Sequence, residues 1–195
     1  MFKIEFSPEN TLTVNLWPAL IILLIACTIS IIVRRKQIKE AIASFREGKT
    51  DQDFIQKCQQ LKRVYWSKQT RNVHDTVCGM LSAVYLEQGN EAGFFQNLNE
   101  LKSEIGEIDT AVYMLFMQYF TGKGYLEIGA DYRQKKDQTE DIKEIVLKMI
   151  GDRPELQEGF AQKAQVFADR LTNETIKKAF SVFADLVNKG SKAQQ

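Results

Sequence analysis

Proline is scarce in this sequence and absent from its long central part. The chain has 195 residues and three prolines, Pro8, Pro18 and Pro154. Inside a helix or a central strand proline removes a backbone hydrogen bond, so structured segments avoid it, whereas all-β domains place it in their many turns and edges. The proline-free part, in which apolar residues recur every three or four positions, predicts an all-α fold.

Histidine and cysteine are equally sparse, which limits the metal chemistry of the chain. His74 is the only histidine, so a multi-histidine metal site is excluded. Cys78 follows four residues later on the same predicted helix face, but two ligands do not make a structural zinc site, which needs four. Cys58 supplies a third only if the fold brings it there. Together with Cys27, these cysteines form no C-x-x-C pair and are typical of free thiols in a reducing compartment.

The sequence also lacks the short motifs of common nucleotide-binding and hydrolytic enzymes. It contains no G-x-x-x-x-G-K-[ST], G-x-G-x-x-G, G-x-S-x-G or H-E-x-x-H. Gly122-Lys123-Gly124 is too short to hold a phosphate and is typical of a turn. We therefore predict a protein that is not an enzyme and that has no cofactor and no metal ion.

No excess of charge of one sign is present. The chain has 26 lysine and arginine residues against 25 aspartate and glutamate residues, a net charge of +1. Nucleic-acid-binding domains usually carry a strong positive field. We therefore expect no nucleic acid among the partners.

One long hydrophobic run stands out against this polar background. Residues 16–33 carry no charge, and 18 residues at about 1.5 Å of helix rise each span roughly 27 Å, close to one hydrocarbon core. Trp17 at the start and Arg34, Arg35 and Lys36 after the end are the residue types found at membrane interfaces. The run predicts a single permanent transmembrane helix.

Two other fates of this run stay open. A cleavable signal peptide needs a basic leader and a small-residue cut site, whereas Lys3 here stands against Glu5 and Glu9. The segment Leu24-Ile25-Ala26-Cys27 resembles a bacterial lipobox, in which the cysteine is lipidated and becomes the new N-terminus. A lipoprotein normally turns polar after that cysteine, but here an apolar and then basic stretch follows. Lipidation at Cys27 is thus an alternative to the permanent anchor.

Lysine and arginine are more frequent after the run than before it. Because basic flanking segments stay on the cytoplasmic side, we expect the N-terminus outside and the large C-terminal domain in the cytoplasm. The predicted location is the cell membrane, with a single pass.

The helical part contains one segment with a repeat-like pattern. In MLSAVYLEQGNEAGFFQNLNEL, residues 80–101, a helix with Leu81, Ser82 and Tyr85 is followed by a Gly89-Asn90 turn and a second helix with Leu98. This arrangement resembles the tetratricopeptide repeat, a helix–turn–helix unit with a period of 34 residues. A shift by that period places Leu81, Tyr85 and Leu98 on Leu115, Tyr119 and Tyr132.

The resemblance covers roughly residues 76–136 and is incomplete. Phe94 stands where the family has a helix-contact alanine, Gly106 replaces its closing proline, and Cys78 replaces its first-helix tryptophan. The position in the second copy that corresponds to Leu101 is Lys135. The resemblance implies a stack of antiparallel helical hairpins, with another helical solenoid or bundle as the open alternative.

The predicted organisation has five parts. The parts are a short extracytoplasmic leader (1–15), the transmembrane helix (16–33), the tetratricopeptide-like hairpins (34–136), C-terminal helices that cap the stack (137–190) and a frayed tail (191–195).

A stripe of apolar residues along 176–187 either packs on the end of the stack or binds a partner or the membrane.

Charge is distributed unevenly along the hairpins. Residues 54–74 contain five basic residues and no acidic one, whereas residues 87–109 are mainly acidic. The basic stretch 57–71 also contains aromatic residues and suits either an anionic lipid surface or an acidic peptide segment of a protein partner. The partner-binding candidates are Lys62, Arg63, Trp66, Lys68 and Arg71.

These observations favour a membrane-anchored, non-catalytic adaptor or scaffold that recruits a protein partner to the cytoplasmic face of the membrane. The alternatives are a structural subunit of a larger membrane complex and an extracytoplasmic lipoprotein chaperone lipidated at Cys27. The sequence leaves the oligomeric state open.

Overall fold

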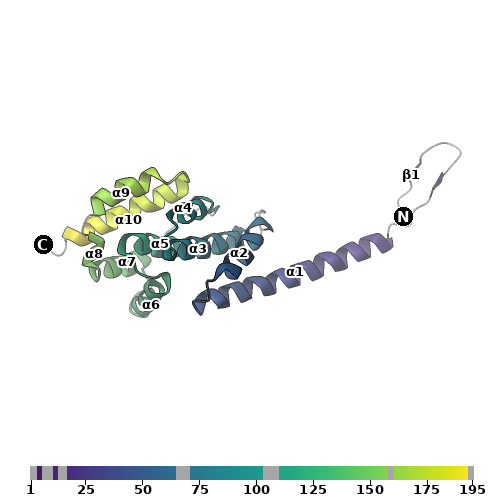
Figure 1. The fold of residues 1–195 in the computed structure, drawn as a ribbon, viewed down its shortest axis with the longest axis horizontal. Helices are drawn as coiled ribbons and strands as arrows, with labels where there is room; N and C mark the ends of the chain where they lie inside the picture. The colour runs from purple at the N-terminus through teal and green to yellow at the C-terminus, as the bar shows by residue number, and fades with distance from the viewer. Residues whose placement is uncertain are drawn as a thin grey trace. The chain divides into compact units, whose positions relative to one another are not determined.

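The structure is a computed structural model that describes residues 4–5, 11–12, 17–64, 71–102, 110–157 and 160–192. These residues are helical apart from one short antiparallel strand pair near the N-terminus (Figure 1). The elements are β1 (Ile4–Glu5), β2 (Thr11–Leu12), α1 (Trp17–Arg46), α2 (Gln52–Val64), α3 (Arg71–Glu87), α4 (Glu91–Asn99), α5 (Thr110–Thr121), α6 (Tyr125–Lys136), α7 (Ile142–Gly151), α8 (Pro154–Gln157), α9 (Phe160–Asp169) and α10 (Glu174–Lys192).

The chain divides into two compact units, residues 1–43 and 44–195. The first unit contains the strand pair, in which Ile4 lies opposite Leu12, and most of α1. The strand pair lies in the part predicted as a leader, for which no strands were predicted.

Helix α1 contradicts the predicted transmembrane anchor. The apolar run is not a helix of its own. It is part of α1, which continues through the exposed residues Arg34, Arg35 and Lys36. Across the described ranges, no helix combines the length and the apolar character needed to cross a membrane.

The predictions that depended on the anchor are therefore corrected. The structure does not support a single-pass topology over residues 16–33, a cell-membrane location or the orientation of the chain across a bilayer. The residues predicted at the membrane interfaces are ordinary members of α1: Trp17 begins it, and Lys36 Nζ lies 3.8 Å from Glu40 Oε1 one turn later.

The second unit is built from packed helix pairs, which confirms the predicted fold in this coarse form. Helix α3 packs against α4 and α5 packs against α6, while α3 also lies against α2 and α5. Three helices end at a glycine with a positive φ: Gly48 (70°), Gly89 (72°) and Gly122 (68°). L-residues are strained in this conformation, so glycine permits the sharp turns between helices.

Helices α2 and α4 each begin at a capping residue. Asp51 Oδ1 accepts a hydrogen bond from the Phe54 amide at 2.9 Å at the start of α2. Asn90 Oδ1 accepts one from the Gly93 amide at 2.9 Å at the start of α4. Each cap satisfies an amide that has no partner within the helix and so fixes where the helix begins.

The α3/α4 hairpin closes on a glycine that the sequence analysis missed. A Cβ atom at Gly93 would lie 2.7 Å from Tyr85 Cγ, so only glycine allows this approach. On the same hairpin, Ser82 Oγ donates a hydrogen bond to the Phe94 carbonyl at 3.3 Å. The small residues that set the spacing of the two helices are therefore Ser82 and Gly93, while Phe94 is a fully buried core residue.

The core of the second unit is an aromatic cluster that joins α4, α5, α9 and α10. Phe167 on α9 lies at its centre, with ring centroids of six neighbours 4.6–6.2 Å away. Phe180 and Phe183, from the apolar stripe on α10, are buried in the same cluster. The stripe is thus covered by the chain's own helices and is not open to a partner. The six neighbours are Phe94, Phe95, Phe116, Tyr119, Phe120 and Phe180.

The close approach at Gly93 can be tested with two identical substitutions on one hairpin. We expect Gly93→Ala to lower the free energy of unfolding by about 1–3 kcal/mol, because its methyl group overlaps the base of the Tyr85 ring. Gly79→Ala, in α3 with nothing within 4 Å of the added Cβ, should instead raise it by about 0.5–1 kcal/mol through helix propensity. Urea unfolding measures the two changes in free energy. Equal changes in the two variants would contradict the close approach of Gly93 to Tyr85.

Candidate functional site

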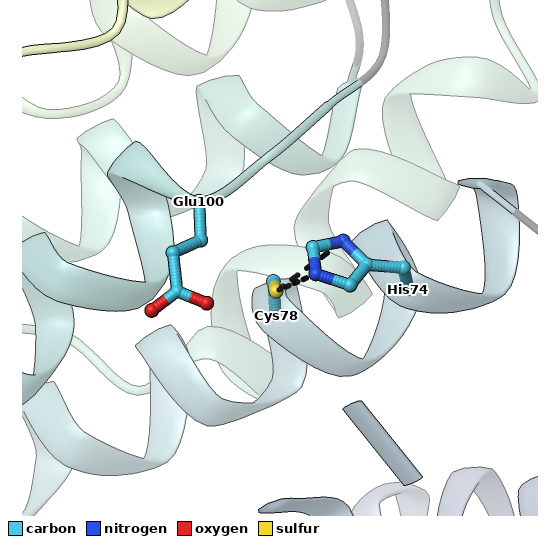
Figure 2. A group of neighbouring side chains, drawn as sticks. All are labelled: His74, Cys78 and Glu100. Carbon is cyan, nitrogen blue, oxygen red and sulfur yellow. Dashed lines mark hydrogen bonds between the residues drawn. The ribbon is translucent and has the colours of Figure 1, made fainter. Parts of the chain in front are cut away.

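Polar side chains from α2, α3 and the end of α4 meet beside the α3/α4 hairpin. His74 and Cys78 lie one turn apart on α3, and Glu100, the residue after α4, faces them (Figure 2). Lys62 reaches the same place from α2. We call Lys62, His74, Cys78, Asn97 and Glu100 the polar cluster. His74 and Cys78 are removed from water, at 4% and 0% exposed, whereas the Glu100 side chain is 38% exposed.

Lys62 links α2 to the end of α4 within the cluster. Its Nζ lies 2.7 Å from Glu100 Oε2 and donates a hydrogen bond to Asn97 Oδ1 at 2.9 Å. Asn97 is itself buried, and its Nδ2 donates to the Gly93 carbonyl at 2.8 Å. The lysine side chain is only 17% exposed, so this pair is weakly screened by solvent compared with an ordinary surface pair.

His74 is oriented by a carboxylate on the neighbouring residue. Its Nδ1 lies 3.1 Å from Asp75 Oδ1, and the same oxygen accepts a hydrogen bond from the Lys102 amide at 2.9 Å. Cys78 Sγ lies about equally far from the two ring nitrogens, 3.6 Å from Nε2 and 3.7 Å from Nδ1 (Figure 2). With Nδ1 engaged by Asp75, Nε2 is the nitrogen left to face the sulfur.

Burial dominates the acidity of the Cys78 thiol. It raises the pKa of Cys78 to about 12, and the opposing charges of the lysines and carboxylates nearby change this little. Burial likewise raises the pKa of Cys58 on α2 to about 12. Neither thiol is a thiolate at neutral pH, so neither has the properties of a catalytic nucleophile.

The backbone that carries Glu100 is held from both sides by the turn between α9 and α10. Asn99 Nδ2 donates to the Arg170 carbonyl at 3.0 Å, and Asn99 Oδ1 accepts from the Thr172 backbone amide at 2.9 Å. Asn173 Nδ2 donates to the Leu101 carbonyl at 2.7 Å. Glu100 therefore points at Cys78 from a fixed position.

The predicted partner-binding residues have different fates. Lys62 is an internal cross-link and not a free surface charge, whereas Arg63 beside it is exposed. Trp66 and Lys68 lie outside the described residues. Arg71 begins α3, but its side chain is also outside them, as is that of Cys27 in α1.

Sequence reasoning missed Asn97 and Glu100 as members of the cluster. Asn97 is 35 positions from the lysine that it contacts, and no local pattern links residues at that separation. The one available signal was the opposite charge of the stretches 57–71 and 87–109, which the Lys62–Glu100 pair joins. The third group beside His74 and Cys78 is thus Glu100 and not Cys58: ligand atoms of these three residues all lie within 4.8 Å of one another.

Comparisons of the chain with protein-family models, with curated proteins and with solved structures found no match. The helix pairs and the polar cluster are therefore the features from which a function is inferred.

The cross-link made by Lys62 can be tested against a lysine of the same helix. We expect Lys62→Met to lower the free energy of unfolding by about 1–3 kcal/mol, because it leaves the buried Asn97 oxygen and the Glu100 carboxylate without their donor. Lys57→Met removes a pair with Asp53 that is about two-thirds exposed, and should change stability by less than about 0.5 kcal/mol. Chemical denaturation measures the free energy of unfolding of both variants. If Lys62→Met leaves it unchanged, the cross-link is excluded.

Proposed function

We propose that the chain is a non-catalytic adaptor whose helical hairpins bind a protein partner. The observation that carries the proposal is the arrangement of α3/α4 and α5/α6 as successive packed pairs, with α3 against α5. Arrays of this kind present the first helices of neighbouring hairpins side by side and use them as an extended binding surface.

A tetratricopeptide-like repeat is the finer form of this proposal. Leu81 and Leu115, which are 34 positions apart, are both buried, and both hairpins turn at a glycine with positive φ. Tyr85 and Tyr119 share that spacing but differ in surroundings: the hydroxyl of Tyr85 accepts from Gln59 Nε2 at 2.7 Å, whereas Tyr119 packs among phenylalanines. The tyrosines therefore serve packing and are not proposed as partner contacts.

The proposed contact surface is the exposed basic side of α2 near its end. Arg63 is exposed there, next to a lysine that is already paired. Lys68 and Arg71 follow in sequence, so three basic residues are assigned to this surface. An acidic peptide segment of a partner is the complementary chemistry, since arginine pairs with carboxylates through two parallel hydrogen bonds.

Charge reversal tests this surface directly. The probe is a fluorescent pool of Asp/Glu-rich peptides, compared with a pool in which Asn and Gln replace the acids. We expect binding of the acidic pool only, and a loss of at least about tenfold, or about 1.4 kcal/mol, in the triple variant Arg63→Glu, Lys68→Glu, Arg71→Glu.

A matched triple variant separates a local surface from the overall charge. Lys163, Lys178 and Lys189 are exposed on α9 and α10, so changing these three lysines to Glu alters the net charge equally. This control should bind like the unmodified chain. Equal losses in both triples would show attraction by overall charge, and no loss in either would refute the surface.

A structural subunit of a larger complex is the second candidate. Nine large apolar side chains of α1, from Leu20 to Val33, are 42–66% exposed, which is unusual for a contiguous stretch of a helix. If another subunit covers them, apolar area is removed from water, and each Å² buried contributes roughly 25 cal/mol of favourable free energy to the association. This candidate predicts no binding of either peptide pool.

A further inference from the structure

The strongest unexplained feature of the second unit is the convergence of three different metal-ligand types, two of them buried and the third, Glu100, 38% exposed. His74 offers an imidazole nitrogen, Cys78 a thiol sulfur and Glu100 a carboxylate oxygen, with ligand atoms within 4.8 Å of one another. In Figure 2 the imidazole and the carboxylate approach Cys78 from different sides. Nothing in the proposed binding of a partner peptide uses this arrangement.

The separation of Cys78 Sγ and His74 Nε2 matches a zinc site, and the directions of the two side chains have to change for a metal to bind both. Zinc binds cysteine sulfur at about 2.3 Å and histidine nitrogen at about 2.0–2.1 Å, so a tetrahedral angle separates the two ligand atoms by about 3.6 Å. Cys78 Sγ is 3.6 Å from His74 Nε2 and 3.7 Å from Nδ1, so the sulfur and the ring must turn relative to each other before the Nε2 lone pair points at a shared metal. The widest pair in the group, at up to 4.8 Å, must close by about 1 Å. Rotation of a glutamate side chain, whose backbone stays fixed, covers such a distance.

The surroundings of the histidine also suit a metal ligand. Histidine ligands usually donate their second ring N–H to a carboxylate or a carbonyl, which fixes the tautomer and the ring orientation. Asp75 occupies that position, 3.1 Å from Nδ1, and is itself held by the Lys102 amide. This leaves Nε2, the nitrogen nearer to Cys78 Sγ, as the ligand atom.

Lys62 is the cation that a metal ion would replace. Its ammonium group neutralises Glu100 and lies close enough to Cys78 to act on the thiol electrostatically. A long, flexible lysine can turn away toward solvent while a dication takes over the carboxylate. Binding then also releases the thiol proton to water, since a coordinated cysteine is a thiolate.

We propose that His74, Cys78 and Glu100 form a binding site for a zinc-type divalent cation, in which Lys62 competes with the metal for Glu100. Three protein ligands leave one position of a tetrahedral zinc ion for water or for an exogenous ligand. The mixture of nitrogen, sulfur and oxygen donors favours a borderline-soft ion such as zinc over magnesium or calcium, which take oxygen ligands.

Cobalt titration of the reduced full-length chain tests the site. Co²⁺ takes the place of zinc and gives a thiolate-to-cobalt charge-transfer band in the near ultraviolet, together with intense visible bands when tetrahedral. We expect both bands, and their loss on addition of Zn²⁺. The charge-transfer band should vanish in Cys78→Ser and persist in Cys58→Ser and Cys27→Ser, which remove the other two thiols.

Three further variants distinguish metal binding from damage to the fold. Glu100→Gln should weaken cobalt binding at least tenfold, whereas Glu91→Gln, on the same hairpin but outside the cluster, should leave it unchanged. Lys62→Met should strengthen cobalt binding, because it frees Glu100 and removes a positive charge; a misfolded variant cannot show such a gain. Cobalt bound without a charge-transfer band, or with equal band loss in Cys78→Ser and Cys58→Ser, would overturn the proposal.

Discussion

The close approach of α3 and α4 is the constraint on which the arrangement of the second unit depends. Glycine at position 93 lets the start of α4 lie against the Tyr85 ring, and Asn90 fixes the residue at which α4 begins. One turn further along α4, Asn97 bonds back to the Gly93 carbonyl and receives Lys62 from α2. Together these contacts align α2, α3 and α4 beside the polar cluster.

Two other kinds of interaction hold α4 against α5, α9 and α10. The aromatic cluster around Phe167 is non-directional and holds α4, α5, α9 and α10 together by burial of large rings. The hydrogen bonds of Asn99 and Asn173 are directional and set the register between the end of α4 and the α9–α10 turn. Burial thus supplies most of the attraction, and the amide side chains determine where Glu100 is placed.

Prediction from the sequence succeeded where the signal is local. The turns at Gly89 and Gly122 were predicted from adjacent residues in the sequence, and helix pairing follows from them. The polar cluster was not predictable, because Lys62 meets Asn97 from 35 positions away and a single sequence carries no record of that contact. The span over residues 16–33 was inferred from apolar character alone, and the structure does not support it.

The most direct test of this account is zero-length carbodiimide coupling of the full-length chain, followed by peptide mass spectrometry. The reagent joins a lysine to a carboxylate only when the two are in contact, as Lys62 and Glu100 are at 2.7 Å. The account predicts an intramolecular Lys62–Glu100 cross-link that Gly93→Ala weakens and Gly79→Ala leaves unchanged. If Lys57–Asp53 couples but Lys62–Glu100 does not, the meeting of α2, α3 and α4 at the polar cluster is contradicted.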